Sequence, residues 1–149
     1  ATLNMYGYDE DGNKTTCEQL IHELKLEGRV FMYDRVNKED IPRFADRYGT
    51  YVNSSVVDNT PVSTMEAMAM GMSIVATTTG GIPFLLKDGV TALLVPPQDP
   101  EAMANALRTL FTHETKAHDL AENARKEAAR FDHDTVMEQW ITLQEKYGK

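Results

Sequence analysis

The chain has 149 residues, 42% of them hydrophobic and 26% charged, with a formal net charge of −8. These values are ordinary for one globular domain with its own core. No apolar run reaches the roughly 18 residues of a transmembrane helix, and no basic block is present of the kind that binds nucleic acid or anionic lipid. We therefore expect no nucleic-acid partner and no membrane span. We also expect no secretory leader, and the single cysteine, Cys17, favours a reducing compartment.

The N-terminal part of the chain alternates apolar strand-like runs with helical periodicity. In chain order it predicts a strand, a helix, a strand, a helix and a strand, at residues 2–6, 16–26, 29–33, 39–48 and 50–53. Gly7 ends the first strand, and Gly28 ends the first helix. Asp9, Asp11 and Asn13 imitate the start of a calcium loop, but the later ligands are missing, so this segment is expected to be a solvated turn.

The rest of the chain continues the alternation. It predicts a helix, two strands and three helices, at residues 63–71, 73–77, 92–95, 100–111, 115–130 and from about 134 onward. Asp99 is placed as N-cap of the first of these last three helices, with Pro100 at its first position. The pattern predicts an α/β fold, a Rossmann-like doubly wound parallel sheet with helices on both faces, in a single domain over residues 1–149.

Ligands of such sheets bind at the carboxyl ends of strands, and the loop after residues 50–53 carries two carboxylates there. Asp58 lies in the loop, and Glu66 lies in the first turn of the helix predicted to follow. Free N–H groups at a helix N-terminus bind phosphate, and a nearby carboxylate accepts hydrogen bonds from sugar hydroxyls. Two other interpretations remain open: Ser63 and Glu66 form a capping box, and Asp58 is a turn residue.

A second loop, residues 77–83, follows the next strand and contains Gly80 and Gly81. Paired glycines let the backbone approach a ligand and point amides at it, although an ordinary turn explains them equally well. A third loop, residues 95–100, is explained by turn and capping chemistry alone.

Taken together, these motifs resemble the C-terminal domain of retaining GT-B glycosyltransferases of family four. The shared order is strand–Ser, an acid, seven residues, Glu-Ala-Met-Ala-x-Gly, an apolar strand, Gly-Gly-Ile, Asp-Gly and Leu-Leu-Val-Pro-Pro. The resemblance covers the whole chain and is strongest over residues 52–97.

The resemblance implies roles for residues in both loops. Glu66 would accept hydrogen bonds from the nucleotide ribose, and Asp58 from hydroxyls of the transferred sugar. The other residues assigned to the donor nucleotide-sugar are Ser55, Thr60, Ser63, Gly80, Gly81 and Ile82. Phe84 stands where many members carry a glutamate, so no charged role is expected there.

The implied activity is transfer of a sugar from a UDP- or GDP-sugar to a glycan or lipid-linked acceptor with retention of configuration. The family needs no metal or other cofactor, because helix N-termini and basic side chains stabilise the diphosphate that leaves. We expect a role in surface polysaccharide synthesis, with the intact protein cytoplasmic or peripheral to the membrane.

The resemblance also implies that the chain is a fragment. It begins at the second strand of the family's domain, so the first βα unit with its phosphate-binding Arg and Lys, one middle strand and the N-terminal acceptor domain are expected to lie outside it. The fragment alone is therefore expected to be inactive. The apolar stripe of the last helix, with Trp140, Leu143 and Tyr147, is expected to pack on its own domain rather than face the acceptor domain.

Two other functions remain open. One is a non-catalytic sugar-nucleotide-binding module with a regulatory or assembly role. The other is an unrelated flavodoxin-like domain, which lacks the Glu-Ala-Met-Ala-x-Gly and Gly-Gly-Ile order.

Overall fold

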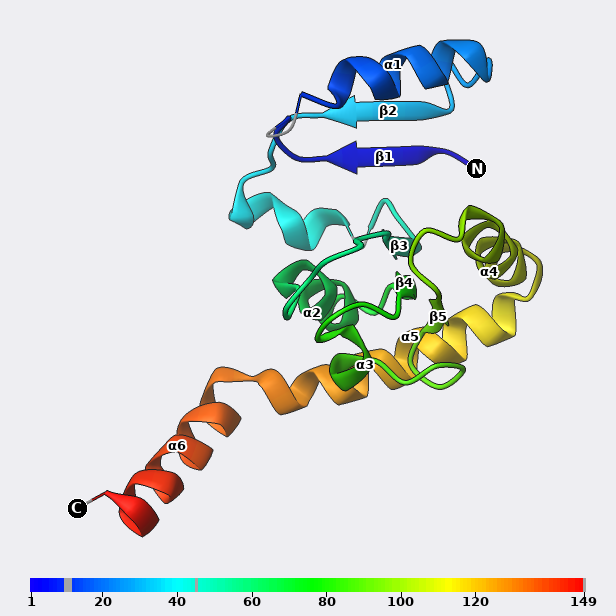
Figure 1. The fold of residues 1–149 in the computed structure, drawn as a ribbon. Helices are drawn as coiled ribbons and strands as arrows, with labels where there is room; N and C mark the ends of the chain where they lie inside the picture. The colour runs from blue at the N-terminus through cyan, green and yellow to red at the C-terminus, as the bar shows by residue number, and fades with distance from the viewer. Residues whose placement is uncertain (10–11, 45, 149) are drawn as a thin grey trace. The chain divides into compact units, whose positions relative to one another are not determined.

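The computed structural model describes residues 1–9, 12–44 and 46–148, and it contains two compact units, Ala1–Arg43 and Phe44–Lys149. All strand pairs in the described residues are parallel. They form two sheets, β1-β2 in the first unit and β3-β4-β5 in the second (Figure 1). Asp11 of the expected calcium-like turn and Ala45 of the expected second helix lie outside the described residues.

In the first unit, β1 (Leu3–Tyr6) pairs along its whole length with β2 (Val30–Tyr33), in a register that joins Tyr6 to Tyr33. The rings of these two tyrosines stack with centroids 4.9 Å apart. Helix α1 (Lys14–Glu23) connects the strands and ends before the predicted residue 26. The chain turns at Lys25, whose φ of 54° lies in the left-handed region, so the helix cannot continue.

The second helical pattern forms a short 3₁₀ helix, η1 (Lys38–Phe44), in place of the expected helix over residues 39–48. Pro42 lies inside it. Proline has no N–H to donate and clashes with the preceding turn, so an α-helical ladder cannot run through this position. The apolar residues at the end of the pattern still pack, because Tyr48 contacts the core of the second unit.

The second unit contains strands β3 (Thr50–Asn53), β4 (Ser73–Thr77) and β5 (Leu93–Val95), with β4 in the centre. Its helices are α2 (Val62–Ala69), α3 (Ile82–Leu85), α4 (Pro100–Thr112), α5 (Glu114–Ala128), the 3₁₀ helix η2 (Ala129–Phe131) and α6 (His133–Tyr147). The short helix α3 is absent from the sequence prediction, because four residues are too few to show periodicity.

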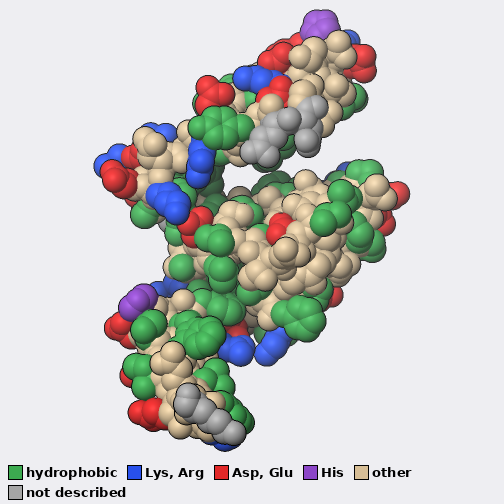
Figure 2. Space-filling model, turned by 60° about the vertical axis from the view of Figure 1, so that its left-hand side comes forward, with side chains coloured by type: hydrophobic (Ala, Val, Ile, Leu, Met, Phe, Trp, Pro, Cys, Tyr) green, Lys and Arg blue, Asp and Glu red, His purple; other side chains and the backbone are tan. Residues whose placement is uncertain are grey.

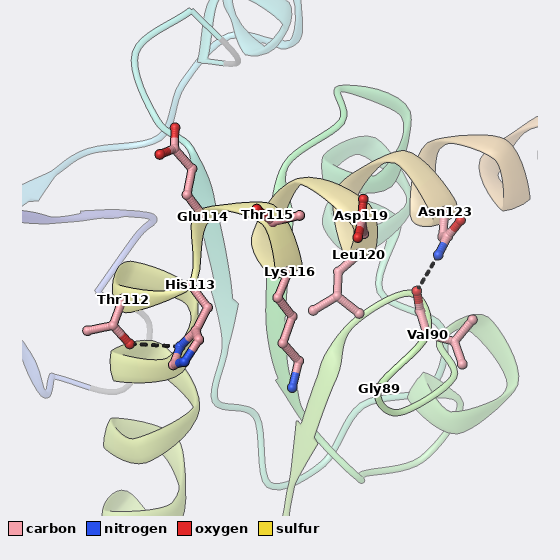
Figure 3. Close-up of a pocket in the computed structure, with 10 residues that line it drawn as sticks. All are labelled: Gly89, Val90, Thr112, His113, Glu114, Thr115, Lys116, Asp119, Leu120 and Asn123. Carbon is pink, nitrogen blue, oxygen red and sulfur yellow. Dashed lines mark hydrogen bonds between the residues drawn. The ribbon is translucent and has the colours of Figure 1, made fainter.

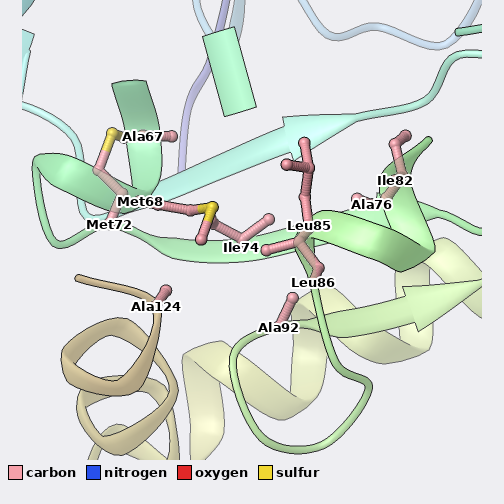
Figure 4. Packing of buried hydrophobic residues seen from close by; sticks show 10 residues of the cluster. All are labelled: Ala67, Met68, Met72, Ile74, Ala76, Ile82, Leu85, Leu86, Ala92 and Ala124. Atoms are coloured by element: carbon pink, nitrogen blue, oxygen red, sulfur yellow. The ribbon is translucent and has the colours of Figure 1, made fainter. Parts of the chain in front are cut away.

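Strand β4 is buried on both faces, which confirms the predicted α/β class with helices on both sides of the sheet. Ile74 and Ala76 point into a cluster with residues of α2, α3 and α5 (Figure 4). Val75 points into a second cluster, with residues of α4 and α5. Helix α5 contributes Ala124 to the first cluster and Leu120 to the second, so it contacts both cores.

Helix α4 begins as predicted: the Asp99 carboxylate accepts a hydrogen bond from the Ala102 N–H at 2.9 Å. Helix α6 differs from the expectation. None of its described residues is buried, and Trp140 and Tyr147 are 60% and 68% exposed. The prediction that its apolar stripe packs on its own domain is therefore wrong. Figure 2 shows hydrophobic side chains along the surface of this helix.

Candidate functional site

The predicted site residues of the second unit come from two adjacent loops. The first loop joins β3 to α2, and the second joins β4 to α3. Because β3 and β4 are parallel neighbours, with Asn53 paired to Ala76, their carboxyl ends lie at the same edge of the sheet. This is the edge at which open α/β sheets bind ligands.

The two loops touch through the glycine pair. The Gly81 N–H donates a hydrogen bond to the Asp58 carbonyl oxygen at 3.3 Å. A Cβ atom added at Gly80 would overlap the Asp58 carbonyl oxygen, and one added at Gly81 would overlap the Asn59 carbonyl oxygen. Both glycines are therefore required by the approach of one loop to the other.

The Asp58 side chain is contacted by Asn53, which, like Thr77, was not singled out from the sequence. Its carboxylate oxygen Oδ2 lies 3.5 Å from Nδ2 of Asn53, the last residue of β3. The Ser55 N–H donates to Asn53 Oδ1 at 2.9 Å, and Thr77 Oγ1 donates to the Ser55 carbonyl at 2.6 Å. The only sequence signal for Asn53 and Thr77 is that each is a polar residue ending an apolar strand.

Glu66 lies in the second turn of α2, because the helix begins at Val62 with Pro61 at the N-cap. The capping-box interpretation is therefore wrong: no side chain caps α2, and Ser63 Oγ instead lies 2.8 Å from the Tyr51 hydroxyl. In the part of the chain that the structure describes, the half-buried Glu66 side chain has no hydrogen bond or ion pair. Its carboxylate is free to accept hydrogen bonds from a ligand.

The start of α2, which lies between Asp58 and Glu66 in the chain, offers unpaired donors. The Thr64 and Met65 N–H groups both donate to the Pro61 carbonyl. The N–H groups of Val62 and Ser63 have no partner among the described residues. Such groups and the helix dipole attract anions, so a phosphate is the chemistry that this position favours.

The remaining predicted residues differ in exposure. Thr60 is exposed at the rim, whereas Ile82 is fully buried in the first core cluster and its N–H donates to the Thr79 carbonyl at 3.0 Å. The Ile82 side chain thus anchors the loop from within. Phe84 is 90% exposed on α3, so this rim position is apolar and uncharged.

A hollow of about 570 Å³ lies elsewhere in the second unit, at the turn between α4 and α5. In Figure 3 the side chains of Lys116 and Glu114, both among its lining residues, extend in opposite directions. None of the predicted site residues lines this hollow. No group of three metal-binding side chains occurs within the described ranges. Among the helices of those ranges, none is both long and apolar enough to cross a bilayer.

Comparison with known proteins agrees with this fold. The model of the family "Glycosyl transferases group 1" matches residues 1–127. The D-inositol 3-phosphate glycosyltransferase of Corynebacterium urealyticum is 29% identical over 126 residues, which is 85% of this chain and 30% of that protein. The chain therefore spans about a third of this relative.

Solved structures show the same likeness. Anabaena HepE, crystallised with UDP, is 27% identical and superposes with a TM-score of 0.89, over 98% of this chain and 41% of that one. HepE has also been crystallised with UDP-glucose. Sucrose-phosphate synthase from Thermosynechococcus elongatus, also 27% identical, gives a TM-score of 0.87 over 97% of this chain and 38% of that one.

The parallel α/β fold and its likeness to these structures define a Rossmann-like domain of the GT-B type. The chain belongs to the glycosyl transferase group 1 family.

Proposed function

We propose that this chain is the donor-binding part of a glycosyltransferase that takes its sugar from a UDP- or GDP-sugar. The observation that carries the proposal is that the Asp58 loop, which contacts the glycine loop, leads into a helix with unpaired N–H groups at its start and the half-buried Glu66 in its second turn. The binding of UDP and UDP-glucose by HepE supports the same ligand class.

In this proposal each group has one task. Glu66 accepts hydrogen bonds from the ribose hydroxyls, and Asp58 accepts them from the transferred sugar. Thr60, Ser63 and the N–H groups of α2 receive the diphosphate. Ser55, Gly80, Gly81 and Ile82 form the two loops that carry these contacts.

The reaction that follows is sugar transfer with retention of configuration. The bond between the anomeric carbon and the diphosphate oxygen breaks, and the diphosphate leaves with the electron pair. The acceptor hydroxyl gives its proton to the departing diphosphate and forms a new bond to the anomeric carbon on the same face. We propose that the acceptor, a glycan or lipid-linked sugar, binds to a part of the protein outside this chain.

The test is a titration of the chain with UDP, GDP and ADP, followed by amide NMR. We expect binding on the order of millimolar, about −4 kcal/mol, with shifts at Gly80, Gly81 and the loop that carries Asp58. Glu66→Ala should weaken binding about tenfold, because it removes hydrogen bonds to a charged group. Glu101→Ala, which changes an exposed glutamate in the first turn of α4, is the matched control.

The ribose role has its own control in the 2′-deoxynucleotide. If Glu66 binds the ribose, the wild-type chain prefers the ribonucleotide, and Glu66→Ala loses that preference. Equal losses for both nucleotides in the variant would contradict the assignment. Absence of binding by all three nucleotides to the folded chain would contradict the donor site itself.

A further inference from the structure

The side chain of Asn53 connects the end of β3 to the loop that carries Asp58. It is only 6% exposed, so its amide must form its hydrogen bonds within the protein. Its Oδ1 accepts the Ser55 N–H at 2.9 Å, a side-chain-to-backbone bond two residues along that closes a tight turn. This bond fixes the orientation of the amide, so that Nδ2 faces Asp58.

Thr77 holds the same turn from the neighbouring strand. It is 2% exposed at the end of β4, and its hydroxyl donates to the Ser55 carbonyl at 2.6 Å. Ser55 is thus bonded through its N–H to β3 and through its carbonyl to β4. The start of the loop cannot move relative to the sheet without breaking one of these bonds.

The other end of the loop is held by the glycine pair. Gly81 donates to the Asp58 carbonyl, and the missing Cβ atoms of Gly80 and Gly81 leave room for the backbone of Asp58 and Asn59. The loop is therefore held at Ser55, before Asp58, and at the Asp58 carbonyl itself. Among the described residues, the Asp58 carboxylate is contacted by one uncharged donor, at a distance of 3.5 Å, which leaves most of its acceptor capacity unused.

We propose that Asn53 and Thr77 are positioning residues that aim the Asp58 carboxylate at the transferred sugar, without touching the ligand themselves. This inference rests on the proposed function, in which Asp58 meets that sugar. It predicts that the two residues affect recognition of the sugar and leave recognition of the nucleotide unchanged.

The first test uses the ligand-free chain and NMR. Asn53→Ala removes both side-chain bonds, so we expect faster hydrogen exchange at the Ser55 amide and a shifted Asp58 carboxyl resonance. Asn53→Asp keeps an oxygen acceptor for Ser55 but replaces the donor facing Asp58 by a negative charge. We therefore expect a shifted Asp58 resonance with the Ser55 amide still protected. An Asp58 resonance unchanged in both variants would overturn the proposal, whether or not any ligand binds.

The matched control lies at the opposite end of the same two strands. Thr50 Oγ1 and Ser73 Oγ are 2.9 Å apart at the amino ends of β3 and β4. Thr50→Val removes this bond, which joins β3 to β4. Thr77→Val removes the bond to Ser55, which joins the loop after β3 to β4. If the Asp58 resonance responded only to a general loss of stability, it would shift in both variants. The proposal predicts a shifted Asp58 resonance for Thr77→Val alone.

The second test separates sugar from nucleotide. Affinities of wild-type and variant chains are measured for UDP and UDP-glucose, and for GDP and GDP-mannose. We expect Asn53→Ala and Thr77→Val to weaken binding of the preferred sugar nucleotide about fivefold, the worth of one hydrogen bond, while the free nucleotide binds as before. Equal losses for both ligands would overturn the inference and leave the donor site standing. Failure of the wild-type chain to bind any of the four would overturn the proposed function, and the ligand-free test would still decide the positioning.

Discussion

Gly80 and Gly81 are glycines because another stretch of backbone occupies the place of their side chains. Gly80 also has a φ of 54°, in the region where other residues are strained. Gly89 has a similar φ of 69°, but a Cβ atom there would meet nothing within 4 Å. A substitution at either glycine would therefore strain the backbone, but only a substitution at Gly80 would also overlap other atoms.

This difference predicts the result of a matched pair of substitutions. Gly89→Ala should destabilise the chain by about 1 kcal/mol, the strain of a left-handed alanine. Gly80→Ala should lower the free energy of unfolding by about 2 kcal/mol more than Gly89→Ala does, because its methyl group must displace the Asp58 carbonyl. Urea denaturation measures both free energies of unfolding, and amide shifts report the displaced loop. Equal destabilisation by the two variants would contradict the close approach.

The sequence could single out the two acids as candidate site residues, but not the contact that Asp58 makes. Asp58 and Glu66 could be recognised from their spacing and from the motifs around them. Asn53 and Thr77 act through contacts between the ends of neighbouring strands, and such contacts leave no periodic pattern in one chain. The capping-box alternative is wrong because the helix begins two residues earlier than that motif requires, with Pro61 as the N-cap in place of Ser63.

Helices α2 and α4 begin differently, although both sequences offer a polar residue near the start. Asp99 accepts the Ala102 N–H and satisfies one of the free donors of α4. Ser63 lies inside the first turn of α2, and its hydroxyl forms a solvent-exposed hydrogen bond with the hydroxyl of the half-buried Tyr51.

Removing each side chain should separate a cap from a surface contact. We expect Asp99→Ala to lower the free energy of unfolding by about 1 kcal/mol. Ser63→Ala should lower it by less than about 0.5 kcal/mol, because its partner remains accessible to water. Urea midpoints of the two variants test this order. A larger loss for Ser63→Ala would restore the capping box and contradict the observed helix start.

Most elements of the second unit could be predicted because their apolar residues face a core with a clear period. Strand β4 and helix α4 are the best cases, and their predicted positions match the structure to within a residue. The second helical pattern failed for a local reason, the proline inside it. Helix α6 formed as predicted, but amphipathic spacing does not reveal what its apolar face contacts.

The grouping of the strands into sheets and compact units was the feature hardest to predict from the sequence. The alternation of strands and helices predicted parallel pairing, but it does not say which strands pair. The structure groups them into two sheets, in two compact units. Every fully buried side chain in the described residues belongs to the second unit.

We therefore predict unequal protection against hydrogen exchange. Amides of β4, buried on both faces, should exchange at the rate of global unfolding. Amides of β1 and β2, which have no buried core around them, should exchange at least about a hundredfold faster. Exchange-detected NMR of the whole chain gives both rates under one condition. Similar rates for β2 and β4 would mean that the two units unfold together.

The same distribution of buried side chains sets the heat capacity of unfolding. A chain of 149 residues that melts as one cooperative body should show a step of about 2 kcal/mol/K. If only the second unit melts cooperatively, roughly a hundred residues contribute, and the step falls to about 1.4 kcal/mol/K. The first unit would then appear in a calorimetric scan as a sloping baseline before the transition, with no peak of its own.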